Sequence, residues 1–282
     1  MKLNLCKSLA AVAVLGGVLA ATQTLAFDAV SVNVAPAAKS GGFVGLGVGF
    51  APDYEGSDDH EAIPAPFGSY QWTSGRSVEL GGTQGSEHAA RLSANIISSD
   101  WSSVWTAGPL VQYRLERDSV DNKQVDKMEN VDAATELGAH AGFKVGAWSG
   151  QLAFAGDVSD EHDGYIVYLK GVYELLVNDR FILDFGAGVA YADSNYMEAY
   201  FGVDNKNRGS SGLPDYKPDS GIKDVELTLT GLYQFNDAWG MVGSVGWTRM
   251  LNDAEDSPLV DGNGGVGDEN QISGVLAVTY AF

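Results

Sequence analysis

The sequence predicts an all-β fold: a transmembrane, antiparallel, up-and-down β-barrel of twelve strands, with ten strands as the alternative count. Three observations predict it. Long segments alternate apolar and polar residues with a period of two, as in a strand that has one apolar and one polar face. The connections between them alternate between short and long, which is typical of the two ends of a membrane barrel. The chain also ends on a strand with outward aromatic residues.

The first 26 residues have the features of a cleaved signal peptide. Lys2 and Lys7 make the start positive, residues 9–20 are apolar, and small residues precede a cleavage site between Ala26 and Phe27. Such a leader directs the chain across the inner membrane. We therefore expect a signal peptide over residues 1–26, a periplasmic segment over 27–42 and the barrel over 43–282.

Composition excludes several classes of protein. The 282 residues carry 17 basic against 37 acidic side chains, a net charge of −20, and loss of the two leader lysines makes the mature chain more acidic still. A nucleic-acid-binding protein is excluded, because phosphates require a cationic surface. An apolar fraction of 45% excludes a disordered acidic tail. Cys6 is the one cysteine, so the mature chain forms no disulfide and no zinc–thiolate site.

Each expected strand is read from its alternation. In the clearest one, over residues 132–146, every charged side chain falls on one face, and two later segments repeat the pattern. The expected strands are 43–51, 63–73, 76–82, 89–97, 103–115, 131–146, 151–158, 164–176, 180–192, 223–236, 238–250 and 271–282. Their charged faces predict a polar lumen lined by Asp132, Glu136, His140, Lys144, Asp184, Asp224 and Glu226.

The connections fall into two groups. The long ones are acidic and cover 52–62, 116–130, 193–222 and 251–270, whereas the short ones cover 73–75, 147–150, 177–179 and 236–237. Because barrels of this class have short periplasmic turns and long external loops, both chain ends are expected in the periplasm. The loop over 193–222 is long enough to fold inward as a plug. The carboxylates of the other long loops could bind Ca²⁺ or Mg²⁺ and so bridge to lipopolysaccharide phosphates, although solvated acidic loops are the simpler interpretation.

The last strand carries a second membrane signal. Leu276, Val278, Tyr280 and Phe282 alternate on its outer face, and the chain stops on the aromatic residue. A terminal strand that places Tyr280 and Phe282 in this way is typical of the signal read by outer-membrane assembly machinery. We expect a monomer in the outer membrane of a Gram-negative bacterium, in contact with lipid and lipopolysaccharide.

Short motifs occur in order along the mature chain. Their residues are Pro52, Tyr54, Gly56, Ser57, Gly108, Pro109, Arg117, Asp118, Tyr200, Phe201, Gly202, Val203, Ser211, Gly212, Leu213, Pro214, Tyr216, Ser257 and Pro258. The ordered set resembles the MltA-interacting protein/OmpV family of outer-membrane proteins over essentially the whole mature chain. Leu115 and Glu116 depart from the pattern, since an aromatic residue and a glycine are expected there.

The resemblance implies a scaffold that brings a murein synthase together with a lytic transglycosylase; other members of the family are described as adhesins or surface antigens. The predicted periplasmic turns of two to five residues offer little surface for two enzymes, so in a scaffold residues 27–42 would carry much of the contact; the other interpretation of this segment is an ordinary flexible lead-in to the barrel. The alternatives are a narrow channel lined by the mixed charges of the lumen, or an outward-facing adhesin.

The sequence predicts no enzymatic activity, catalytic residue, metal site or cofactor. It contains no Gly-x-Ser-x-Gly elbow, His-Glu-x-x-His motif or phosphate loop. His140 has acidic residues on its own strand, but a spacing of four residues separates side chains by about 13 Å, which is too far for a hydrogen-bonded pair.

Overall fold

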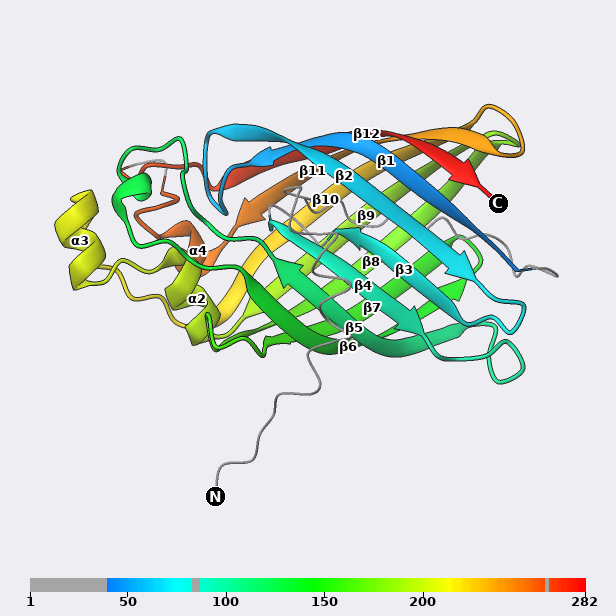
Figure 1. Cartoon of the computed structure of the whole chain (residues 1–282), viewed down its shortest axis with the longest axis horizontal. Helices are drawn as coiled ribbons and strands as arrows, with labels where there is room; N and C mark the ends of the chain where they lie inside the picture. Colours follow the sequence, from blue (N-terminus) through cyan, green and yellow to red (C-terminus); the bar gives the residue numbers. More distant parts are fainter. Residues whose placement is uncertain (1–39, 83–86, 262–263) are drawn as a thin grey trace, which may run out of the picture.

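The computed structural model describes residues 40–82, 87–261 and 264–282, and these residues form a closed antiparallel barrel (Figure 1). Its twelve strands neighbour one another in chain order, and β1 pairs with β12 to close the wall. The predicted up-and-down topology and the count of twelve strands are therefore confirmed. The expected cleavage site at Ala26–Phe27, and residues 27–39 of the expected periplasmic segment, lie outside the described residues.

The strands are β1 (Gly41–Pro52), β2 (His60–Gln71), β3 (Ser77–Gly82), β4 (Ala89–Asn95), β5 (Trp105–Arg114), β6 (Ala134–Val145), β7 (Trp148–Asp157), β8 (Tyr165–Asn178), β9 (Phe181–Ala192), β10 (Gly221–Gln234), β11 (Trp239–Met250) and β12 (Asn270–Ala281). The helices are η1 (Val125–Lys127), α2 (Ser194–Phe201), α3 (Asn205–Ser211) and α4 (Asn252–Glu255). The predicted strands lie close to the observed ones, because the alternation of apolar and polar residues stops where a strand leaves the wall of the barrel.

The two ends of the barrel differ. At one, which we call the loop end, the described connections are 53–59, 87–88, 115–133, 158–164, 193–220 and 251–269, and helices α2, α3 and α4 lie there in Figure 1. At the other, which we call the turn end, the connections are 72–76, 96–104, 146–147, 179–180 and 235–238. The C-terminus also lies at the turn end (Figure 1).

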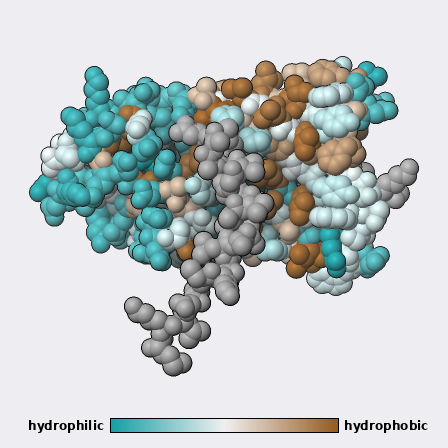
Figure 2. Space-filling view, viewed as in Figure 1, coloured by the Kyte–Doolittle hydropathy of each residue, from teal (hydrophilic) through white to brown (hydrophobic). Residues whose placement is uncertain are grey.

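The outer wall is apolar. Side chains that alternate outward are exposed although they are hydrophobic, for example Leu46 at 66% and Leu276 at 60%. Figure 2 shows apolar residues gathered over the barrel part of this face, while the loop end is hydrophilic. Tyr280 and Phe282 point outward, and Phe282 stacks on Tyr70 with ring centroids 6.2 Å apart. A ring of apolar and aromatic side chains on the outside of a barrel is the surface that lipid covers.

No helix among the described residues combines the length and the apolar character that a membrane-spanning helix needs.

Two prolines in β2 fit the geometry of the wall. The Trp72 N–H donates to the Arg76 carbonyl across the β2–β3 turn at 2.9 Å, so even-numbered residues of β2 direct their N–H groups toward β3. β3 pairs with β2 only as far as Gly68. Pro64 and Pro66 therefore lie beyond this last pair, where no ladder bond to β3 needs an N–H.

Candidate functional site

The lumen is filled at the loop end by a buried layer of ion pairs. We call this the closing layer; it consists of Glu55, Glu87, Arg114, Glu136, Tyr168, Tyr196, Lys223 and Asp224. Wall strands supply some of these residues, and loops supply the others. Charges that are taken out of water must be compensated by partners, so the contacts of this layer decide whether it is stable.

Arg114 is the centre of the closing layer. Its Nε donates to Glu136 Oε1 at 2.7 Å, and its two Nη atoms contact Glu55 and Glu87, each at 3.3 Å. The side chain is 1% exposed. A guanidinium has donors in several directions, which explains how one side chain holds three carboxylates that come from different parts of the chain.

Lys223 is the second cation of the layer. Its Nζ lies 2.7 Å from Glu55, 3.1 Å from Glu87 and 2.7 Å from Asp224. Strict alternation places Lys223 on the outer face, so the sequence did not predict it in the lumen. The β9–β10 ladder shifts register between Ile222 and Asp224, and this bulge turns Lys223 and Asp224 inward together.

Helix α2 caps the closing layer. The Asp193 carboxylate accepts hydrogen bonds from the N–H groups of Tyr196 and Tyr165, which fixes the start of the helix on the barrel rim. The Tyr196 hydroxyl donates to Glu55 at 2.6 Å. The Arg114 guanidinium lies 4.8 Å from the centre of the Tyr196 ring, a cation–π contact. The cap therefore depends on the same ion pairs that fill the lumen.

Most of the family-motif residues hold this cap. Arg117 donates to the Tyr200 carbonyl at 3.1 Å, and Ser257 donates to the Phe201 carbonyl at 2.7 Å. Tyr216 donates to the Asp253 carbonyl at 2.8 Å. The others found at the loop end are Pro52, Tyr54, Gly56, Ser57, Asp118, Gly202, Val203, Ser211, Gly212, Leu213, Pro214 and Pro258. The motif residues thus come from four loops that pack together over the lumen.

Gly108 and Pro109 are exceptions, because they lie in the wall on β5. A Cβ atom on Gly108 would be 1.8 Å from the Ala94 carbonyl oxygen, so this position requires glycine for the close approach of β4.

The seven residues predicted to face the lumen have different surroundings. Glu136 and Asp224 belong to the closing layer, and Glu226 is buried inside the barrel. His140, Lys144 and Asp184 line the cavity described below. The prediction for Asp132 is wrong: β6 begins at Ala134, two residues later, and Asp132 is exposed in the loop before it.

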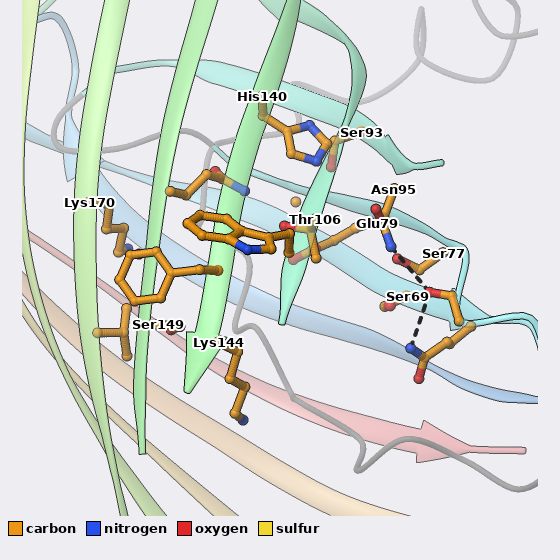
Figure 3. Close-up of a pocket in the computed structure, with 18 of the residues that line it drawn as sticks. Ser69, Ser77, Glu79, Ser93, Asn95, Thr106, His140, Lys144, Ser149 and Lys170 are labelled. Carbon is orange, nitrogen blue, oxygen red and sulfur yellow. Dashed lines mark hydrogen bonds between the residues drawn. The ribbon is translucent and has the colours of Figure 1, made fainter. Parts of the chain in front are cut away.

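A cavity of about 500 Å³, lined by both polar and apolar side chains, occupies the lumen on the turn-end side (Figure 3). It reaches from the turns, at Gly75 and Ser102, to the charged residues Arg91 and Lys170 inside the barrel. Figure 3 shows that its labelled side chains come from several strands around the barrel. Arg91 connects the cavity to the closing layer, since it donates to Gln112 at 2.7 Å, Gln112 donates to Glu136 at 2.7 Å, and the Arg91 guanidinium lies 4.5 Å from the centre of the Tyr168 ring.

The loop Glu55 is kept ionised by its partners. Burial alone would raise the pKa of Glu55, but the ion pairs with Lys223 and Arg114 outweigh burial and hold its pKa below the ordinary value of 4.5. Because the pKa is lowered by folding, Glu55 stabilises the folded state fully above pH 4.5 and loses this contribution as the pH falls through the folded value.

Acidification below pH 4.5 is therefore expected to lower the stability of the barrel more in the native protein than in Glu55→Gln. The measurement is the urea midpoint of unfolding in detergent micelles as a function of pH. Glu129→Gln serves as the control, because Glu129 is exposed at the loop end and its contribution is small. Parallel pH curves for the native protein and Glu55→Gln would contradict the role given to the ion pairs.

Among the residues that the structure describes, no three His, Cys, Asp or Glu side chains are grouped so that they could hold a metal ion. His162 contacts Glu136 at 3.2 Å and packs against the rings of Tyr196 and Tyr200, so this histidine is part of the buried packing at the loop end.

Comparisons with known proteins found a matching family model, related sequences and similar solved structures. A family model described as MltA-interacting protein MipA matches residues 44–282. The MltA-interacting protein of Escherichia coli is 31% identical over 39% of this chain and 44% of its own. The outer membrane protein OmpV of Vibrio cholerae is 28% identical over 52% of this chain and 55% of its own. These matches span about half the length of each relative. A KdgM porin structure aligns over 85% of this chain and 99% of its own, with 11% identity and a TM-score of 0.44.

Proposed function

The chain belongs to the MltA-interacting protein MipA family and is an outer-membrane β-barrel protein, and we propose that it acts by binding proteins at its turn end. In this proposal the turn end faces the periplasm, as the short connections of membrane barrels do. The partners are a murein synthase and a murein-cleaving transglycosylase. A relative that carries the name MltA-interacting protein supports this choice of partner.

The observation that carries the proposal is the difference between the two ends of the lumen. The closing layer and α2 fill the loop end, whereas the turn end has an open cavity and an exposed aromatic side chain. A barrel that is blocked toward one side and open toward the other can admit part of a partner only at the open side.

The turn end also has more surface than the sequence predicted. The connection 96–104 presents Trp101, whose side chain is 75% exposed. Hydrogen bonds hold this turn in one shape: the Ser99 N–H donates to the Ser74 carbonyl at 2.7 Å, and Ser102 Oγ accepts from the backbone of residues 104 and 105. A rigid, exposed tryptophan is the kind of side chain that dominates protein–protein binding energy.

Replacing Trp101 by alanine is expected to reduce co-purification of murein enzymes from crosslinked envelopes at least tenfold, since a central aromatic contact is worth about 2 kcal/mol or more. The matched control is Trp148→Ala, because Trp148 is 61% exposed on the outer wall, where it packs against Tyr173. Equal recovery with both variants would show that Trp101 serves only as a membrane anchor.

The segment before the barrel is a second candidate contact. Gly41 and Gly42 already pair with Gln71 and Tyr70 in the β1–β2 ladder, so a deletion that spares the barrel must stop at residue 39. Deleting residues 27–39 alongside the Trp101 variant separates the two surfaces. If the enzymes are lost only with the deletion, they need the segment before the barrel. If they are lost only with the Trp101 variant, they need Trp101. If each change alone abolishes recovery, they need both surfaces.

A narrow channel is the second candidate function. The observation that favours it is the cavity itself, which penetrates the barrel from the turn end and stops at a layer made of side chains rather than at a strand. Side-chain layers can rearrange, and mixed charges are common in solute pathways. Steady conductance of the intact protein in planar bilayers would favour the channel over the scaffold.

A further inference from the structure

We infer that the turn-end cavity is a binding site for a short, uncharged saccharide. The inference is independent of the protein partners discussed above, because it concerns the inside of the barrel. It depends on the chemistry of the lining, on two buried polar atoms without hydrogen-bond partners, and on the way the cavity is closed.

Hydroxyl groups surround the cavity. They come from strands β2, β3, β4, β5, β7 and β10, in the side chains of Ser69, Ser77, Ser93, Thr106, Ser149 and Thr228. A hydroxyl both donates and accepts a hydrogen bond, and so does each hydroxyl of a sugar. The hydroxyls of the lining can therefore bind sugar hydroxyls either as donors or as acceptors, and they remain uncharged in both cases.

Arg91 and Lys144, two cations of the cavity wall, already have partners. Arg91 donates to Gln112 at 2.7 Å and lies 4.5 Å from the centre of the Tyr168 ring. Lys144 and Glu174 form an ion pair at 3.2 Å. Since these cations have partners in the wall, a bound anion would have to break existing pairs. The lining therefore favours a ligand without net charge.

Two buried polar atoms on the wall lack hydrogen-bond partners. His140 is 8% exposed, lines the cavity and has no partner at Nδ1, and Asp184 has none at Oδ1 (Figure 3 labels His140). Leaving such atoms unpaired is costly, and most buried polar atoms in folded proteins are satisfied. A ligand hydroxyl could donate to Asp184 Oδ1, and His140 Nδ1 offers a second position for a hydrogen bond.

Size and access agree with a small ligand. A cavity of about 500 Å³ falls within the range of roughly 300 to 1,000 Å³ that is usual for small-molecule sites. Ser102 and Gly75 lie on its rim at the turn end, and the closing layer blocks the opposite side. A saccharide that enters from the turn end would be retained rather than passed through.

The test uses the purified mature barrel in a detergent without a sugar head group, because maltosides and glucosides would compete. Maltose, cellobiose and N,N′-diacetylchitobiose are titrated by calorimetry, with the dipeptide Ala-Ala and inorganic sulfate as probes for zwitterions and anions. We expect at least one disaccharide to bind at millimolar concentration or below, and neither Ala-Ala nor sulfate to bind. Asp184→Asn and His140→Ala should each weaken this binding about tenfold, as expected for loss of a hydrogen bond in a buried site.

Asp237→Asn is the matched control, since it makes the same charge change on an exposed turn outside the cavity. Thermal melting of each variant shows that the barrel is intact. Three results would overturn the inference: no disaccharide binds, Ala-Ala or sulfate binds in its place, or disaccharide binding is the same in Asp184→Asn and His140→Ala as in Asp237→Asn.

Discussion

Replacing Arg114 by methionine is expected to lower the free energy of unfolding by about 3 to 5 kcal/mol, because the change leaves buried carboxylates without their partner. Glu136, Glu55 and Glu87 each contact this guanidinium, and all three are buried. Methionine has a similar length but no charge, so the effect measures the ion pairs more than the volume of the side chain. Unfolding by urea in detergent micelles, followed by tryptophan fluorescence, gives the difference.

The control for this prediction is Arg208→Met. Arg208 pairs with Asp215 at the loop end, but both side chains are about half exposed. Surface ion pairs contribute about 0 to 1 kcal/mol, so this variant should unfold close to the native protein. If Arg114→Met and Arg208→Met differ by less than about 1 kcal/mol, the closing layer does not stabilise the barrel in the way its geometry indicates.

A double variant separates the effect of losing the ion pair from the effect of leaving a buried carboxylate without a partner. Arg114→Met combined with Glu136→Gln removes the carboxylate that lies nearest to the guanidinium, at 2.7 Å. Since much of the cost of breaking a buried pair comes from the charge that remains, the double variant should recover part of the lost stability.

The wall of the barrel could be predicted from the sequence because strand alternation is a local property. A lipid-facing strand must be apolar at every second position, and twelve such segments are present. Alternation also gives the inward direction of Glu136 and Asp224. It fails at Lys223, because the bulge between Ile222 and Asp224 depends on pairing with β9 and leaves no mark in the spacing.

The closing layer could not be predicted for a different reason. Glu55, Glu87 and Tyr196 come from three separate loops, and loop conformation is decided by tertiary contacts rather than by periodicity. A signal was nevertheless present. The family motifs include Tyr54 and Tyr200, which flank these loop residues, and a motif in a loop is more often explained by function or packing than by the local chain.

The gathering of motif residues at the loop end bears on the proposed function. They hold a cap that closes the lumen, whereas the proposed docking residue Trp101 and the cavity lie at the turn end. In the proposed function the two ends therefore have separate roles: the loop end seals the barrel, and the turn end binds partners. A channel that conducts continuously needs an open lumen, which such a layer of side chains blocks.

Removing the cap is expected to open the barrel. In this variant a short Gly-Ser linker replaces residues 194–218, which takes away Tyr196 and Tyr200 together with their contacts to Arg114. The intact protein should be silent in planar bilayers, and the variant should show single-channel steps. The steps should be cation-selective, since the carboxylates of the closing layer outnumber its cations, Arg114 and Lys223.

The matched control replaces only α3, residues 205–211, by the same linker. Within the region 194–218 this helix is the part that packs least, because Ser211 is its one buried residue, so the control should stay silent. Silence of the variant without residues 194–218 would mean that Glu55, Glu87 and the wall residues seal the lumen by themselves. Steady conductance of the intact protein would contradict the closed lumen and would make the channel the better function. Conductance that appears only after removal of the cap agrees with a sealed barrel whose binding surface is its turn end.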